Sequence, residues 1–101
     1  MGGPQGKKVL APSALWGLTI DKLATDATDG VVVMRVYAGS AADSAGLQAG
    51  DRILTIDGRW TDTVIDCYEV VSAIKAGQTA VVKVNRGGQE RELKVQPRIG
   101  L

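Results

Sequence analysis

A glycine turn leads directly into an apolar strand in the stretch Leu15-Trp16-Gly17-Leu18-Thr19-Ile20. A turn whose successive backbone N–H groups point into one concavity forms a binding site for a carboxylate. An exposed strand edge beside such a turn can pair with the peptide that carries the carboxylate. We therefore expect this stretch to hold the end of another chain, next to an open strand edge.

Composition indicates one small domain without a charged partner. The chain has 101 residues, of which 45% are hydrophobic, so it can fill a single core. Its 12 basic and 11 acidic residues leave a net charge of +1, which argues against nucleic acid or an acidic membrane as a partner. The sequence contains no apolar run of the roughly 20 residues that span a membrane.

Catalytic and metal-binding patterns are absent from the sequence. Cys67 is the single cysteine and the chain has no histidine, so neither a zinc cluster nor a Cys/His catalytic pair can form. Asp51 and Asp57 each border a glycine, where aspartate normally serves a turn. The glycine-rich run at residues 85–88 lacks the lysine and hydroxyl of a phosphate loop. We expect no enzyme activity of its own, no metal and no cofactor.

The first half of the domain reads as a hairpin followed by a short helix. Residues 18–23 alternate apolar and polar side chains, and residues 31–37 are rich in β-branched residues, which predicts two paired strands. Ser40 followed by Asp43 has the spacing of a capping box, and Gly46 supplies a stop. This pattern predicts a helix of one to two turns.

The second half predicts a strand, one long helix and a final hairpin. Residues 52–56 form the strand, and Asp57-Gly58 reads as its turn. The long helix is expected over residues 64–76, with Thr63 as its N-cap and Gly77 as its left-handed stop. The last two strands are expected at Val81–Val84 and Glu92–Val95. On the helix, the side chains that share or border one apolar face are Cys67, Val70, Val71 and Ile74.

These elements predict an α+β domain. We expect a small, partly open β-barrel or sandwich of five to six strands, with one short and one long helix. Residues 1–12 read as a flexible leader or expression remnant in which a first strand can form, residues 13–97 as the domain, and residues 98–101 as a C-terminal tail.

Several motifs in this order resemble the PDZ domain over about residues 13 to 97. The run Leu15–Leu18 resembles the carboxylate-binding loop of that family, Gly39–Leu47 its short-helix signature, and Gly50–Gly58 its most recognisable run. The long helix resembles the helix that lines the groove. The sequences of these motifs are similar to those of bacterial PDZ modules in HtrA-type serine proteases and related processing proteases.

The resemblance implies peptide recognition by strand addition. A peptide would lie between the strand at 18–23 and the long helix, and its hydrophobic C-terminal residue would enter an aliphatic pocket. The implied partners are therefore protein C-termini, delivered to a linked protease. The implied carboxylate site is Leu15, Trp16, Gly17 and Leu18, and the implied groove residues are Thr19, Ile20, Cys67, Val70, Val71 and Ile74.

Two positions depart from the family pattern. Leu15 stands where the family often has glycine. Cys67 stands where many members have a histidine, and a thiol accepts a hydrogen bond from a ligand hydroxyl poorly. A small or apolar side chain is therefore expected two residues before the ligand's terminus.

Other interpretations stay open at the level of sequence. The chain could be a structural or regulatory module that docks internal segments or a neighbouring domain. Trp16 could contact a ligand or cap its own core, and Lys7 and Lys8 could approach the carboxylate or be solvated. The tail at residues 96–101 ends in a hydrophobic residue, so it could dock into a neighbouring molecule or fray. The compartment is undetermined, with a periplasmic or membrane-associated parent protein among the alternatives.

Overall fold

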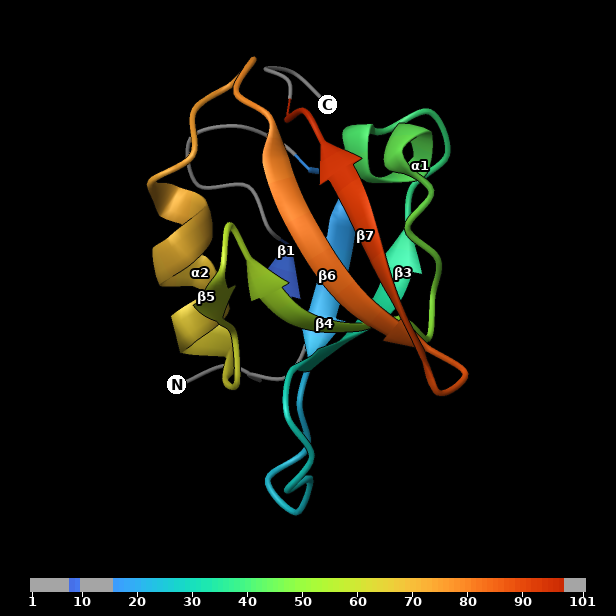
Figure 1. The fold of residues 1–101 in the computed structure, drawn as a ribbon, viewed down its shortest axis with the longest axis vertical. Coiled ribbons are helices and arrows are strands. Elements are labelled where there is room, and N and C mark those ends of the chain that lie inside the picture. Colours follow the sequence, from blue (N-terminus) through green and yellow to red (C-terminus); the bar gives the residue numbers. More distant parts are fainter. Residues whose placement is uncertain (1–7, 10–15, 98–101) are drawn as a thin grey trace, which may run out of the picture.

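The computed structural model describes residues 8–9 and 16–97, in which seven strands and two helices follow one another along the chain (Figure 1). In order they are β1 (Lys8–Val9), β2 (Leu18–Asp21), β3 (Val31–Val36), α1 (Ala41–Ala45), β4 (Arg52–Ile56), β5 (Arg59–Trp60), α2 (Val64–Ser72), β6 (Ala80–Arg86) and β7 (Gln89–Val95). The strands pair antiparallel in the order β1-β2-β3-β4-β6-β7, and β5 pairs with β4. The predicted α+β class and its partly open sheet are confirmed.

Helix α1 forms because its two ends are capped as the sequence predicts. The Ser40 hydroxyl accepts a hydrogen bond from the Asp43 N–H at 3.1 Å, and the Asp43 carboxylate accepts one from the Gly39 N–H at 2.9 Å. Gly46 adopts a left-handed conformation with φ of 94°, which ends the helix. Ala41 and Ala42 face the core.

Helix α2 begins where the sequence predicts but ends four residues early. The Thr63 hydroxyl accepts a hydrogen bond from the Asp66 N–H at 2.9 Å, which fixes the first turn. The backbone N–H groups of Ala73 and Ile74 donate three residues back, to Val70 and Val71. This tightening ends the α-helix at Ser72, so the predicted extension to Ala76 is wrong.

The last hairpin is longer than predicted. β6 and β7 pair along seven residues each, from Ala80 opposite Val95 to Arg86 opposite Gln89. The sequence placed β7 only at residues 92–95, because charged residues such as Glu90 have low strand propensity. Their side chains face solvent while the backbone stays in the ladder, so pairing with β6 overrides the local preference.

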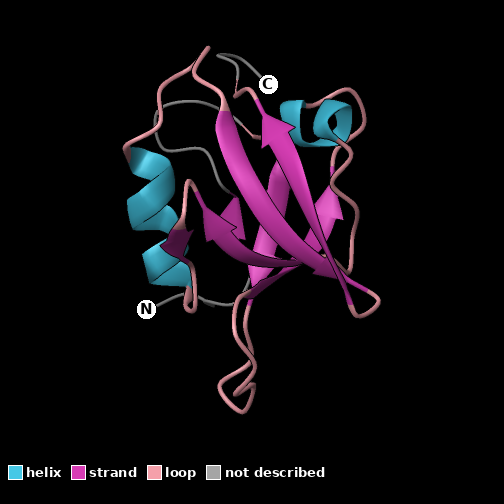
Figure 2. Cartoon of the chain, in the orientation of Figure 1, coloured by secondary structure: helices cyan, strands magenta, loops and turns pink. Residues whose placement is uncertain are grey.

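Strand β2 is shorter than predicted and ends at Asp21 rather than Leu23. Figure 2 shows the loop between β2 and β3 extending away from the rest of the sheet. Lys22 begins this loop and its ammonium group donates to the carbonyls of Thr28 and Asp62. These bonds turn the chain out of the ladder and attach the loop to the segment before α2.

One hydrophobic cluster joins the sheet to both helices. Trp16, Val31, Ile53, Val82 and Val84 are buried completely within it. In the described ranges 8–9 and 16–97, neither helix combines the length and hydrophobicity of a membrane span.

Candidate functional site: the Trp16–Leu18 turn and the β2 edge

The turn before β2 is attached to the fold through its carbonyl groups. The Trp16 carbonyl accepts a hydrogen bond from the Ala42 N–H at 2.9 Å, and the Gly17 carbonyl accepts one from the Tyr37 N–H at 2.9 Å. Gly17 has φ of 81°, and a Cβ added there would lie 2.1 Å from the Ser40 Cβ. The turn therefore requires glycine for its conformation and for its contact with the N-cap of α1.

The N–H groups of this turn, unlike its carbonyls, are not used in holding the fold together within the described residues. Within the described part of the chain, the N–H groups of Trp16 and Gly17 donate no hydrogen bond to another residue. Two adjacent donors without a described acceptor are suited to bind an anion. Leu15, the first residue of the predicted carboxylate site, lies outside the described residues.

Backbone pairing to β3 decides which groups of β2 face outward. The Gly17 carbonyl bonds to Tyr37 of the β3 side, so Leu18, the next residue, directs its N–H and C=O the opposite way. Ile20 lies opposite Val33, whose own N–H and C=O are bonded to Asp51 and Gly50. Ile20 therefore also directs its backbone groups to the outer edge.

That outer edge carries a strand of the same chain. β1 pairs antiparallel with β2, with Lys8 opposite Ile20 and Val9 opposite Thr19. The sequence predicted an open edge at this position, and that prediction is wrong for the state described. A first strand was expected to be possible within residues 1–12, but the sequence did not indicate that it would pair with the outer edge of β2.

The predicted groove residues come together in one place. Ile20 of β2 belongs to the same hydrophobic cluster as three side chains of α2 and one just after it, which are Cys67, Val70, Val71 and Ile74; Thr19 is buried but is not part of this cluster. Each of them is buried, from Leu18, Ile20 and Cys67 at 0% exposure to Ile74 at 7% and Thr19 at 8%. With β1 along β2, the predicted groove is closed, so a ligand can reach these side chains only if the local packing opens.

Comparison with known families identifies the domain. The sequence pattern of the PDZ domain matches residues 19–96. The chain belongs to the PDZ domain family. This membership agrees with the geometry, in which a strand edge, a glycine turn and a helix are arranged around one apolar cluster.

Relatives of this PDZ domain are larger proteases. It is 29% identical over 75 residues to the serine protease Do-like HtrA of Lactobacillus helveticus, covering 74% of this chain and 18% of that protein. It is 36% identical over 70 residues to a probable periplasmic serine endoprotease DegP-like of Ectopseudomonas mendocina, covering 69% of the chain and 15% of the relative. The chain thus spans less than a fifth of the length of these relatives.

Solved structures show the same fold. The HtrA-type protease AlgW with a decapeptide superimposes with a TM-score of 0.77 at 27% identity, over 88% of this chain and 30% of that one. The HtrA3 PDZ domain bound to a phage-derived ligand, FGRWV, superimposes with a TM-score of 0.73 at 19% identity, over 92% and 89% of the two chains.

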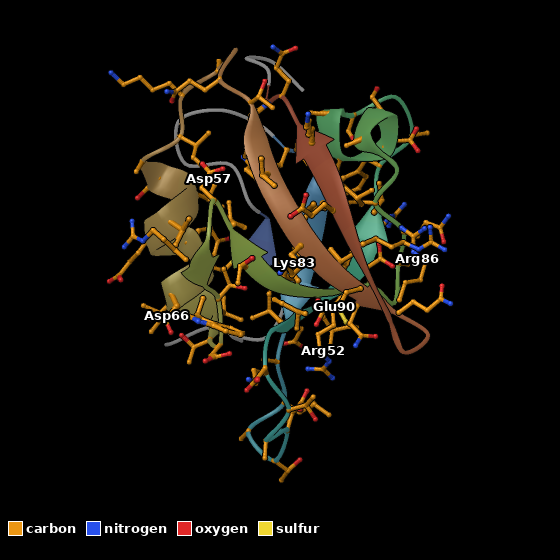
Figure 3. All side chains as sticks on the ribbon, in the orientation of Figure 1. Arg52, Asp57, Asp66, Lys83, Arg86 and Glu90 are labelled. Atoms are coloured by element: carbon orange, nitrogen blue, oxygen red, sulfur yellow. The ribbon has the colours of Figure 1, made fainter. Side chains whose placement is uncertain are left out.

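Cys67 of the PDZ domain is a free, buried cysteine in an environment that disfavours its thiolate. Burial, with a smaller contribution from the neighbouring carboxylate of Asp66, labelled beside α2 in Figure 3, raises the pKa of its thiol to about 12. A nucleophilic cysteine needs a lowered pKa and a nearby cation or base. The interpretation of Cys67 as a plain buried side chain is therefore favoured over a catalytic one.

This environment gives a measurable result. At pH 8, alkylation of Cys67 in the native domain is expected to be slower than in denaturant by about a thousandfold, because three pKa units separate the two thiols. Measuring both rates with iodoacetamide checks this, and equal rates would contradict it.

The raised pKa of Cys67 also makes stability depend on pH. Since the pKa of the thiol is higher in the folded state than in the unfolded state, the stability contributed by the neutral thiol is complete below about pH 9 and is lost between pH 9 and 12.

The other candidates from the sequence have structural roles. Trp16 is fully buried, which favours the core interpretation, and among the described residues its indole N–H has no hydrogen-bond partner. Asp51 binds Arg86, and the Asp57 carboxylate accepts a hydrogen bond from the Val81 N–H. The side chains of Lys7 and Lys8 and the tail at 98–101 lie outside the description.

The structure contains an open hollow next to the end of β2 that was not predicted from the sequence. It has a volume of about 630 Å³ and lies between the end of β2, the following loop and the start of α2. Leu23 and Ile65 line it, with exposed fractions of 69% and 70%. Isolated apolar residues in a polar loop and on the solvent side of a helix were the available signal.

Proposed function

We propose that this PDZ domain binds the hydrophobic C-terminus of a partner protein by adding it as a strand to β2. The observation that carries the proposal is the outward direction of the backbone groups of Leu18 and Ile20 beside the apolar face of α2. These groups supply main-chain hydrogen bonds, and the aliphatic side chains supply selectivity for an apolar terminal residue.

The terminal carboxylate is assigned to the N–H groups of the turn. Trp16 and Gly17 have donors without described acceptors, and the Leu18 N–H points to the same edge. Hydrogen bonds from fixed amides to a charged group are stronger than those to a neutral one. The AlgW structure contains a decapeptide and the HtrA3 structure a ligand that ends in valine, which supports the same use of the fold here.

The proposal includes a larger parent protein. Each of the two protease relatives described above is more than five times as long as the aligned region, so this domain is assigned to the recognition part of a protease, where it presents substrates or senses exposed C-termini. The chain itself is assigned no catalytic step. Its described residues hold no cluster of three His, Cys, Asp or Glu side chains that could bind a metal.

Amidation of the ligand tests the role of the terminal charge. A peptide ending in valine is expected to lose about tenfold or more in affinity when its carboxylate is amidated, because charge-assisted bonds to the turn are removed. Titration calorimetry with the acid and amide forms of one peptide measures this. A matched peptide with a terminal aspartate controls for the apolar pocket and should bind more weakly than the valine peptide.

One observation favours a second candidate function. β1 is an internal segment without a terminal carboxylate, and it pairs with the same edge. A domain that docks internal segments would bind the acid and amide peptides equally. That result would replace C-terminal recognition by internal-segment docking.

A further inference from the structure

We infer that β1 is a tethered competitor that occupies the peptide-binding edge and must leave before a ligand binds; this inference rests on the proposed function. β1 runs antiparallel to β2, so it points toward the turn at Trp16–Leu18. A C-terminal peptide on this edge would run in the same direction. β1 and the ligand therefore need the same place.

The two occupants also need the same hydrogen-bonding groups. Ile20 faces outward because its partner in β3, Val33, uses its own N–H and C=O on the opposite side, at 2.8 Å each. In an antiparallel ladder a residue pair of this kind exchanges two hydrogen bonds. Lys8, which lies opposite Ile20, thus satisfies the N–H and C=O of Ile20 that an added strand would require.

The burial of the groove agrees with a closed state. Leu18, Ile20 and Cys67 have no exposed surface, and Val71 has 1%. A ligand's last side chain has no access to this cluster while the packing is as described. Opening the edge is therefore coupled to opening the apolar site.

The described pairing is short enough to exchange with a ligand. β1 pairs through two residues, whereas β6 and β7 pair through seven each. A short edge strand opens more readily than the central strands of a sheet. Its attachment to the same chain nevertheless gives it a high effective concentration at the edge. Apparent ligand affinity is then the intrinsic affinity multiplied by the fraction of molecules in which the edge is free.

The register of β1 on β2 distinguishes two proline variants, one that removes a hydrogen bond to β2 and one that does not. Lys8→Pro removes an N–H that pairs with Ile20, whereas Val9→Pro removes an N–H that points away from β2, because Val9 lies opposite Thr19. Lys8→Ala controls for loss of the ammonium group. A chain lacking residues 1–10 removes β1 altogether, and the other strand pairings of the sheet do not pass through β1.

Peptide affinity is the first readout. For a peptide ending in valine with a free carboxylate, Lys8→Pro and the shortened chain are expected to bind about tenfold more tightly than the intact chain. This factor corresponds to the one or two backbone hydrogen bonds of β1 that the ligand no longer has to displace. Val9→Pro and Lys8→Ala should bind as the intact chain does. Equal affinity of all five proteins would overturn the inference and leave the proposed function standing.

Hydrogen exchange at Ile20 gives a second readout that needs no ligand. The Ile20 amide should be protected in the intact chain, exchange faster after removal of residues 1–10, and regain protection when peptide is added. Exchange that is unchanged by the removal would overturn the inference. Absence of peptide binding even to the shortened chain would instead overturn the proposed function, and the competition with it.

Discussion

Replacement of Gly17 by alanine is expected to lower the free energy of unfolding by about 3 kcal/mol, through left-handed backbone strain and overpacking together. Gly17 has φ of 81°, and its new Cβ would lie 2.1 Å from the Ser40 Cβ and 2.6 Å from the Ser40 hydroxyl oxygen. Ser40 is buried and caps α1, so it cannot move without disturbing that helix. Urea denaturation followed by circular dichroism measures the effect.

Gly58 provides a matched control for the backbone strain alone. Its φ of 79° is close to that of Gly17, but a Cβ added there meets no atom within 4 Å. Gly58→Ala is therefore expected to cost only about 1 kcal/mol, the strain of a left-handed alanine. If the Gly17→Ala protein loses no more stability than the Gly58→Ala protein, the contact with Ser40 contributes nothing to the loss, and the prediction is wrong.

Replacement of Asp51 by alanine is expected to lower the free energy of unfolding by about 3 kcal/mol, because it leaves the Arg86 guanidinium without its carboxylate and the Gln48 N–H without its acceptor. Asp51 is 1% exposed and accepts hydrogen bonds from Arg86 Nε at 2.7 Å, from Arg86 Nη2 at 2.8 Å and from the Gln48 N–H at 2.9 Å. The hydrogen bond to Asp51 raises the pKa of Arg86. Figure 3 shows Arg86 on the opposite side of the view from α2.

Asp29 is a suitable control for the loss of a carboxylate. It is exposed and lies in the β2–β3 loop, and its side chain makes no described hydrogen bond. Asp29→Ala should change the free energy of unfolding by no more than about 0.5 kcal/mol, as is usual at the surface. A double-mutant cycle of Asp51→Ala with Arg86→Ala separates the pair from other effects. A loss below about 1 kcal/mol for Asp51→Ala would contradict the assigned role.

Local signals predicted well wherever a few adjacent residues decide the structure. The Ser40–Asp43 spacing located the start of α1, and Thr63 located the start of α2, because a capping bond spans only three residues. The turn at Asp57 and Gly58 was also predicted, and both residues have positive φ. Ends of elements were predicted less well, since α2 ends where Ala73 and Ile74 bond three residues back, and β7 extends through its pairing with β6.

The candidate site was predicted in part. The cluster formed by β2 and α2 follows from two apolar patterns, which had to meet in one core because the chain can build only one. The pairing of β1 with β2 was not predicted, because the choice of partner for a short strand is not encoded in its own residues. The hollow beside Ile65 was not predicted either, because it joins two segments that are about forty residues apart in the sequence. The closure of the predicted groove follows from the position of β1 along β2.

The sequence by itself determined the order of elements, the glycine turn before β2 and the apolar faces that meet beside it, because these depend on neighbouring residues and on periodicity. Only the tertiary structure decided that Ser40 packs against Gly17, that Arg86 neutralises Asp51, and that β1 lies on the edge offered to a ligand. Such pairings are set by the loop geometry and by competition among all available partners, and no local pattern encodes that competition.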